Sequence, residues 1–305
     1  MAFHGTIAFS TAKLHSVPKA DRTKDKDLQS YTRLNTINMA QRYVRVQTTT
    51  GQLFYGKLQL DRHVQVLDAP PWLEGQPTEQ LIAPENYQLL APCAPSKIVA
   101  IGKNYLKHAI EMGGEVPQEP LLFIKPSTAV IAPNAAIHYP RQSQRVDYEG
   151  ELALVIGDRC VDCTPEQART KIWGYTIAND VTARDLQKKD SQWARAKGFD
   201  TFCPLGPWIV RELSPGAKLQ TFLNDQADPV QSAPISEMNF PPEVLVAYIS
   251  QAITLLPGDV VLTGTPEGVG ALQIGDRVRI EIEGIGSLEN SVVSRQAIAI
   301  SKAAI

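Results

Sequence analysis

Proline and glycine interrupt the apolar segments of this sequence at short intervals. The 305 residues include 22 prolines and 20 glycines, and the apolar runs between them are short. Two such runs, Lys97–Ile101 (KIVAI) and Glu151–Gly157 (ELALVIG), are typical of buried strands. The runs do not alternate regularly with helical patterns, so a doubly wound parallel sheet is disfavoured. We therefore expect an α+β fold that is mostly β, and the 43% hydrophobic content is enough for a sizeable core.

A few short helices are expected among the strands. Tyr105–Met112 is followed by two glycines that would end a helix. Thr164-Pro165-Glu166-Gln167 combines an N-cap residue, a proline at the first helical position and a glutamine at the third. Thr182 and Asp185 have the same capping-box spacing and predict another helix that begins there. Pro242–Leu255 shows helical periodicity.

Composition divides the chain into three parts. Residues 1–38 hold six Lys/Arg, three Asp and few large apolar side chains, so we expect a disordered extension. Two alternatives remain for residues 1–38: they could be a targeting peptide, or translation could begin at Met39. Residues 39–92 alternate in polarity up to about Leu67 and then become proline-rich, which predicts a small β domain with a linker. Residues 93–305 would form the larger, catalytic domain.

Charge and motif content exclude several classes of protein. The net charge of −2 argues against a nucleic-acid binder, and no apolar run is long enough to predict a membrane span. P-loop, G-x-S-x-G and H-E-x-x-H motifs are missing from the sequence. Four cysteines are too few for a disulfide scaffold, so we expect a cytoplasmic protein. Cys160 and Cys163 have C-x-x-C spacing, which fits a zinc or redox site, or two idle thiols.

Acidic residues alternate just before the ELALVIG strand. Asp147, Glu149 and Glu151 would share one face of an extended chain. Carboxylates this close repel one another, and a hard divalent cation would relieve the repulsion. Asp180, which follows the next strand, is the natural third ligand beside Glu149 and Glu151, and such an all-oxygen set suits Mg²⁺ or Mn²⁺. Taken alone, the acidic strand also fits a solvated face, and Asp180 also fits a helix cap.

Basic and imidazole side chains complete a possible site. His108 and Glu111 are three residues apart on a short helix, so the carboxylate could orient the imidazole as a base. An ordinary surface pair is the alternative. Lys125, Arg184 and Lys197 could bind a substrate carboxylate or stabilise an enolate, and each could equally be a surface charge.

Ordered motifs from Ile98 to about Asn290 resemble the fumarylacetoacetate hydrolase family. The run QWARAKGFDTFCPLGP (192–207) is similar to the oxaloacetate-handling branch of that family. The other matching pieces are Gly102–Tyr105 with His108 and Glu111, Glu119–Pro126, Asp147–Leu152, Asn179–Asp185, Pro257–Asp259 and Gly264–Gly270.

The resemblance implies a fold, a metal and a set of roles. The fold would be a mixed β-sandwich roll with short helices, preceded by a small β domain, in a homodimer. Mg²⁺ or Mn²⁺ would be held by Glu149, Glu151 and Asp180, with Lys197 beside it. The helix with His108 and Glu111 would close as a lid. The residues expected to bind substrate are Lys103, Tyr105, Lys125, Arg184, Gln187 and Thr265, although the family often has arginine or an apolar residue at 103.

The implied substrate is a small 2-oxo acid that reacts through a metal-stabilised enolate. Acylpyruvate hydrolysis, with His108 activating water, and oxaloacetate decarboxylation are the expected reactions. Oxaloacetate keto–enol tautomerisation and isomerisation of a 2-hydroxy-diene-dioate are the alternatives. A metal-binding protein that kept the fold without catalysis is the alternative from another class.

Overall fold

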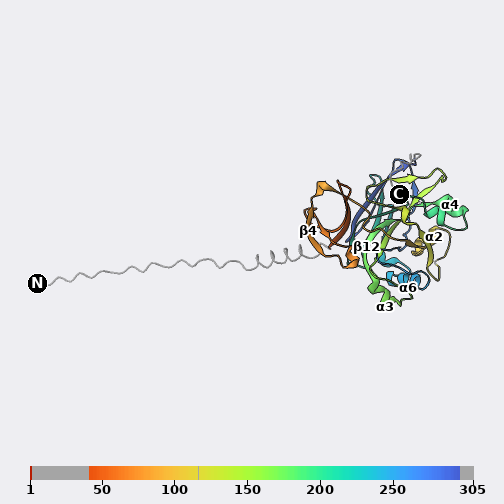
Figure 1. Cartoon of the computed structure of the whole chain (residues 1–305). Helices are drawn as coiled ribbons and strands as arrows, with labels where there is room; N and C mark the ends of the chain where they lie inside the picture. Colours follow the sequence, from red (N-terminus) through yellow and green to blue (C-terminus); the bar gives the residue numbers. More distant parts are fainter. Residues whose placement is uncertain (2–40, 116, 296–305) are drawn as a thin grey trace. The chain divides into compact units, whose positions relative to one another are not determined.

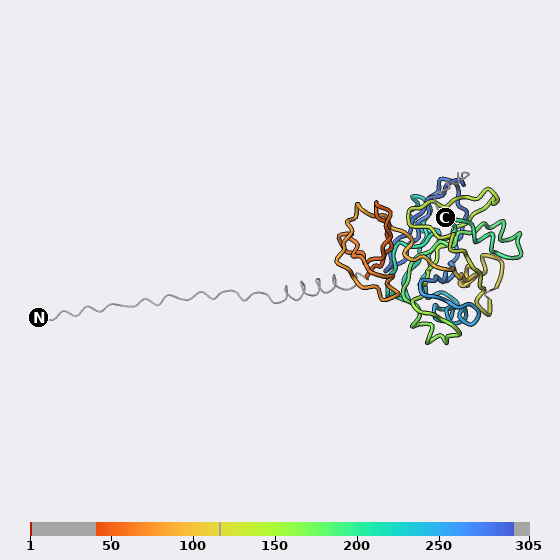
Figure 2. Tube along the Cα trace, in the orientation of Figure 1, coloured from red at the N-terminus to blue at the C-terminus, as the bar shows by residue number. Residues whose placement is uncertain are grey.

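The computed structural model describes Met1, residues 41–115 and residues 117–295. Apart from Met1, the extension expected at residues 1–38 lies outside the described residues. Contacts divide the chain after Met39, and everything below concerns the second unit, Ala40–Ile305. Figure 2 traces this unit from orange at its beginning to blue at its end.

The unit begins with an antiparallel meander in the order β4-β3-β2-β1; the alternating pattern predicted its strands up to Leu67, whereas β4 lies in the segment expected to be a linker. Val44, Val46, Val64 and Val66 point to one side and form its small core with Ile82. The side chains of a strand alternate between faces, so this pattern buries every second residue. The strands are β1 Arg42–Thr48, β2 Leu53–Leu58, β3 Val64–Leu67, β4 Pro77–Ile82 and β5 Tyr87–Leu89, with 3-10 turns η1 Pro71–Leu73 and η2 Pro84–Asn86.

Hydrogen bonds continue this sheet into the rest of the chain. β1 pairs with β14, and the order runs on through β14-β12-β11-β17-β6-β7. The apolar run Glu151–Gly157 is therefore an interior strand with neighbours on both sides, which explains why all of β11 is buried. The added strands are β6 Ile98–Gly102, β7 Leu121–Lys125, β8 Val130–Ile131, β11 Gly150–Ile156, β12 Ile172–Asn179, β14 Cys203–Val210 and β17 Val260–Leu262.

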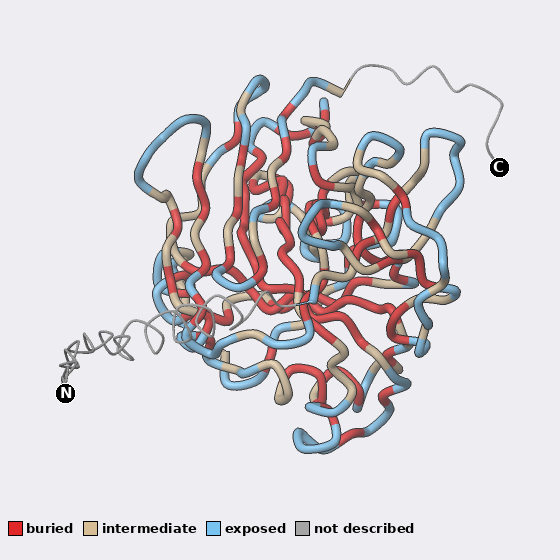
Figure 3. The backbone as a smooth tube through the Cα atoms, turned by 90° about the vertical axis from the view of Figure 1, so that its left-hand side faces the viewer, coloured by how far each residue is buried: buried red, intermediate tan, exposed pale blue. Residues whose placement is uncertain are grey.

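Two smaller sheets complete the β structure. One has the order β16-β15-β19-β20-β9 and the other β13-β10-β18. Buried residues concentrate on the strands and exposed residues on the loops (Figure 3). The strands are β9 Ile137–Tyr139, β10 Val146–Tyr148, β13 Thr182–Ala183, β15 Lys218–Leu223, β16 Gln231–Pro234, β18 Gly270–Leu272, β19 Arg277–Ile282 and β20 Gly286–Ser294. The prediction of a mostly β fold is confirmed.

The helices are short, as expected. Thr164 caps α3 in a full capping box with Gln167. The second predicted box is wrong, because Thr182 lies in β13 and α4 begins at Arg184 without a side-chain cap. α3 and α6 lie side by side, whereas α2 and α4 lie together in another region (Figure 1). The helices are α2 Leu106–Glu111, α3 Pro165–Lys171, α4 Arg184–Lys189, α5 Ala194–Lys197 and α6 Pro242–Ala252, with 3-10 turns η3 Ser127–Ala129 and η4 Ile235–Glu237.

The C-x-x-C motif lies in the loop between β11 and α3. Cys160 and Cys163 are buried free thiols whose sulfur atoms are 2.7 Å apart. Within residues 41–115 and 117–295, neither cysteine belongs to a cluster of three or more metal-ligating side chains. None of the helices in the described part of the chain is long and apolar enough to cross a membrane.

Candidate active site

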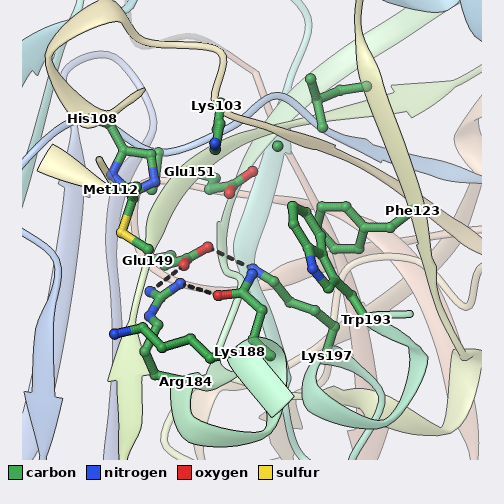
Figure 4. A pocket seen from close by; sticks show the side chains of 14 residues that line it. Lys103, His108, Met112, Phe123, Glu149, Glu151, Arg184, Lys188, Trp193 and Lys197 are labelled. Carbon is green, nitrogen blue, oxygen red and sulfur yellow. Dashed lines mark hydrogen bonds and ion pairs between the residues drawn. The ribbon is translucent and has the colours of Figure 1, made fainter. Parts of the chain in front are cut away.

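A cavity of about 210 Å³ collects most of the predicted site residues. Its lining comes from segments far apart in the sequence, as Figure 4 shows. The carboxylates come from β11 and the residue before it, the imidazole from α2, and the basic side chains mainly from α4 and α5. The lining residues are Ile101, Gly102, Lys103, His108, Met112, Phe123, Glu149, Glu151, Arg184, Gln187, Lys188, Trp193, Lys197 and Thr265.

Three carboxylates converge at the base of this site. One oxygen from each of Glu149, Glu151 and Asp180 lies within 4.8 Å of the others, and all three residues are buried. Pairing of β11 with β12 places Gly150 opposite Asn179, so the acidic residues flanking those positions become neighbours. The Asp180 amide also donates to the Glu149 carbonyl at 2.9 Å. This is the ligand set expected for a divalent cation.

Asp147 does not join this cluster, contrary to the expectation that it would share a face with Glu149 and Glu151. The extended chain is interrupted at Glu149, so Asp147 lies on β10 in a different sheet from β11. The Asp147 carboxylate accepts hydrogen bonds from Arg145 at 2.9 Å and from Arg184 at 2.9 Å. Its place is therefore behind the cluster, where it holds Arg184.

Two of the three cluster carboxylates are paired with cations. Lys197 Nζ lies 2.7 Å from Glu149 Oε2 and 2.5 Å from Asp180 Oδ2. Burial would raise the pKa of Glu149, but the Lys197 ammonium and the Arg184 guanidinium outweigh it and hold the pKa below its usual value. Burial likewise opposes the charge on Lys197, yet Asp180 and Glu149 keep the pKa of Lys197 above its usual value. Lys197 is thus a fixed cation at the cavity wall.

Glu151 is the exception. Within the described part of the chain its carboxylate accepts one hydrogen bond, from the Gly264 amide at 2.7 Å, and makes no ion pair. Burial, followed by the charges of Asp180 and Glu149, raises the pKa of Glu151 well above its usual value. Burying a charged carboxylate without a partner cation lowers the stability of the folded protein. The three oxygen ligands and this missing charge fit a divalent cation such as Mg²⁺ or Mn²⁺.

His108 lines the cavity, whereas its partner Glu111 lies outside the lining. His108 Nδ1 is 3.1 Å from Glu111 Oε2, which leaves Nε2 as the nitrogen able to face the cavity. The Glu111 carboxylate also accepts from the Gly268 amide at 3.1 Å. Glu111 therefore both orients the imidazole and ties α2 to the loop that carries Gly268.

Four predicted substrate residues line the cavity, and three of them, Arg184, Gln187 and Thr265, are linked by hydrogen bonds to the acidic segment directly or through Arg184. Arg184 donates to Gln187 Oε1 at 2.6 Å and to Glu149 Oε1 at 2.5 Å. The Thr265 hydroxyl donates to the Gly150 carbonyl at 2.8 Å, next to Glu149 and Glu151. The cavity thus holds these side chains in place through contacts with the acidic segment itself.

Two predicted substrate residues lie outside the lining. Lys125 is fully buried, and its ammonium donates to Asp180 Oδ1 at 2.6 Å and to two backbone carbonyls. Tyr105 is also buried, and its hydroxyl has no hydrogen-bond partner in the described residues. Burial and the nearby Glu151 raise the pKa of the Tyr105 phenol. Lys125 is placed to orient a cluster carboxylate, not to touch a ligand in the cavity.

Other residues of the site were missed by sequence reasoning. Gln231 accepts from the Gly150 amide at 3.0 Å and donates to Thr265 at 2.8 Å, and it lies 81 residues from Gly150. The Phe123 and Trp193 rings meet edge to face at 5.4 Å on one side of the cavity, and Met112 lies beside His108 on the other (Figure 4). Phe123 and Trp193 lie within segments that matched the family, but neither was singled out as a site residue, and Gln231 and Met112 lie outside the matching pieces.

Comparison with known proteins identifies this arrangement. The sequence profile of the fumarylacetoacetate (FAA) hydrolase C-terminal family matches residues 97–293. The chain belongs to the fumarylacetoacetate hydrolase family. A second profile, the Rv2993c-like N-terminal family, matches residues 41–92. The resemblance inferred from the sequence motifs is thereby confirmed.

Two relatives in the fumarylacetoacetate hydrolase family illustrate the similarity, and the second is named for an enzymatic activity. The chain is 52% identical over 214 residues to protein Rv2993c of Mycobacterium tuberculosis, covering 69% of this chain and 80% of that one. It is 42% identical over 227 residues to the mitochondrial oxaloacetate tautomerase fahd2 of Xenopus laevis, covering 70% and 71%. The cytoplasmic location expected for this chain stays a prediction.

Solved structures of the family show the same fold. The 5-carboxymethyl-2-hydroxymuconate delta-isomerase of Mycobacterium smegmatis matches with a TM-score of 0.77 and 43% identity, over 83% of this chain and 100% of that one. The fumarylpyruvate hydrolase of Pseudomonas aeruginosa, solved in complex with Mn²⁺ and pyruvate, matches with a TM-score of 0.63 and 34% identity, over 68% and 92%. The expected fold of the fumarylacetoacetate hydrolase family is therefore confirmed.

Proposed function

We propose that this protein is a divalent-metal-dependent enzyme that interconverts the keto and enol forms, or the double-bond isomers, of small 2-oxo acids. The observation that carries the proposal is the buried carboxylate Glu151, which has no cation partner among the described residues and shares a cavity with His108. Relatives named as an oxaloacetate tautomerase and as an isomerase support this choice among enolate reactions.

The metal would be held by Glu149, Glu151 and Asp180. It would supply Lewis-acid stabilisation to the negative charge that develops on an enolate oxygen. Lys125 and Lys197 hold Asp180 and Glu149 in position, because their ammonium groups contact these carboxylates directly. Preorganised charges of this kind need no rearrangement during the reaction.

Proton transfer is assigned to His108. Its Nδ1 is held by Glu111, so Nε2 can take a proton from, or return it to, a carbon atom of a ligand in the cavity. The apolar side chains of Met112, Phe123 and Trp193 also line this cavity. Tautomerisation and isomerisation require this proton shuttle and a metal that stabilises the enolate. They do not require an attacking water molecule.

Acylpyruvate hydrolysis is the second candidate. The 3.1 Å contact between His108 and Glu111 favours it, because an oriented imidazole can also activate a water molecule. The fumarylpyruvate hydrolase with a related fold supports this alternative. Oxaloacetate decarboxylation needs only the electron sink, so it remains a further outcome of the same assay.

A direct assay distinguishes these reactions. Chelator-dialysed protein would be given Mn²⁺ or Mg²⁺ and offered enol-oxaloacetate, oxaloacetate and acetylpyruvate, with loss of the enol absorbance, release of CO₂ and release of acetate as readouts. We expect metal-dependent ketonisation of the enol as the fastest reaction, and no activity in Glu151→Ala. Full activity without metal would contradict the proposed site. Metal binding without turnover of any of the three acids would favour the non-enzymatic alternative.

A further inference from the structure

The positive side chains of the cavity differ in how their charge is compensated. Arg184 is paired with Asp147 and Glu149, and Lys197 with Glu149 and Asp180. Lys103 and Lys188 line the same cavity, and neither makes an ion pair with any described residue. The cavity therefore has two uncompensated ammonium groups besides the paired cations.

These two lysines are held differently. Lys188 is exposed on α4, so its flexible side chain keeps much of its freedom. Lys103 is half-buried in the turn between β6 and α2, and its side chain points into the cavity from the side opposite Arg184 and Lys188 (Figure 4). An anion in the cavity would meet Lys103 as the better ordered of the two cations.

The backbone of the turn fixes the direction of Lys103. Its φ of 56° lies in the left-handed region, which residues other than glycine seldom adopt. The ammonium lies against Gly114, in the loop that follows α2, and a Cβ atom added to Gly114 would be 2.7 Å from Nζ. Strained residues of this kind cluster at ligand-binding sites, where the surroundings hold them in place. The backbone conformation and the contact with Gly114 thus both restrict where the Lys103 side chain can lie.

We infer that Lys103 binds a second carboxylate at the far end of the substrate and thereby selects 2-oxo diacids over 2-oxo monoacids. The inference rests on the proposed function, which places the 2-oxo acid end at the acidic cluster. The remaining charge of a diacid would then reach the wall that carries Lys103. A charge-assisted hydrogen bond of this kind is worth a preference of about 10- to 100-fold in affinity.

The test compares two stable ligands of equal chain length. 2-Oxoglutarate and 2-oxopentanoate differ only in that a terminal carboxylate replaces a methyl group. Their affinities for the Mn²⁺-loaded protein would be measured by calorimetry. We expect the wild-type protein to prefer 2-oxoglutarate by about 10- to 100-fold, and Lys103→Met to lose this preference while 2-oxopentanoate binds as before. Lys103→Arg should keep most of it.

Controls separate a local contact from general electrostatics and from misfolding. Lys189→Met removes one positive charge from an exposed position outside the lining and should keep the preference. Unchanged binding of 2-oxopentanoate shows that Lys103→Met is folded. An unchanged preference in Lys103→Met, or its loss in Lys188→Met instead, would overturn the inference. Equal wild-type affinities would contradict the inference alone, whereas failure of both acids to bind would contradict the proposed function as well.

Discussion

The Gly264 amide donates a 2.7 Å hydrogen bond to the carboxylate of Glu151, and in the described residues this is the one hydrogen bond which that carboxylate accepts. Gly264 has a φ of 95°, and a Cβ atom added there would be 2.7 Å from Cβ of Asn104. The turn therefore presents its amide at a position where a side chain would not fit. One neutral donor leaves the charge of Glu151 uncompensated, which makes Glu151 the most sensitive ligand of the proposed metal site.

Glu151→Gln should raise the melting temperature of the metal-free protein. The substitution removes repulsion from Asp180 and Glu149 and keeps an oxygen that can accept from Gly264. In the wild-type protein, Mn²⁺ at 100 times its dissociation constant should add about 2.7 kcal/mol to the free energy of unfolding, and this increment should vanish in the variant. Thermal unfolding with and without Mn²⁺ measures both effects. An undiminished Mn²⁺ increment in Glu151→Gln would remove Glu151 from the metal site.

His108→Ala should separate the candidate reactions. If His108 activates water, acylpyruvate hydrolysis should fall by roughly 10²–10⁴-fold, and decarboxylation of oxaloacetate should fall less because it needs no attacking water. Glu111→Gln should follow more weakly, since it loses the orienting charge and keeps a hydrogen bond. Steady-state rates on both substrates provide the measurement. Equal losses in both reactions would instead assign the pair to lid closure or to the proton shuttle.

Gly268→Ala should loosen α2. Gly268 has a φ of 93°, an added Cβ would collide with the Val230 carbonyl, and its amide holds Glu111 at 3.1 Å. We expect a loss of about 1–3 kcal/mol in the free energy of unfolding and faster hydrogen exchange in α2. Gly275→Ala is the matched control, because Gly275 has a φ of 100° with no atom near the added Cβ. Equal hydrogen exchange of α2 in both variants would show that Gly268 does not hold α2 in place.

The cysteines should react slowly at neutral pH and in a defined order as the pH rises. Burial, followed by the hydrogen bond to Cys163, raises the pKa of Cys160 to about 11, and burial raises the pKa of Cys203 to about 12. Only the thiolate is alkylated, and both side chains are fully buried, so the folded protein should be labelled much more slowly than the same protein in denaturant. Mass spectrometry of iodoacetamide-treated protein should show Cys160 labelled before Cys203. Rapid labelling of Cys160 at pH 7 would point to an activated thiol and revive the redox alternative.

Local patterns were sufficient for much of this protein. The alternating residues of the meander, the apolar run of β11 and the capping box at Thr164 appear in the structure as predicted, because each depends on residues that are neighbours in the chain. The capping-box spacing at Thr182 was misleading for a non-local reason. The backbone of Thr182 pairs with Asp147 in the β13–β10 ladder, and its hydroxyl donates to the Asp180 carbonyl. Neither the backbone nor the hydroxyl of Thr182 is therefore free to cap a helix.

The sequence by itself determined which residue types were available and the short-range spacing of Glu149 and Glu151 and of His108 and Glu111. Tertiary structure alone decided that Asp147 would hold Arg184, that Lys125 would lie beneath Asp180, and that Lys103 would face the cavity without a counter-charge. The physical reason is that a charge acts over a few ångströms of space and not along the chain. Pairing of β11 with β12, and the packing of α2, α4 and α5 around them, set those distances.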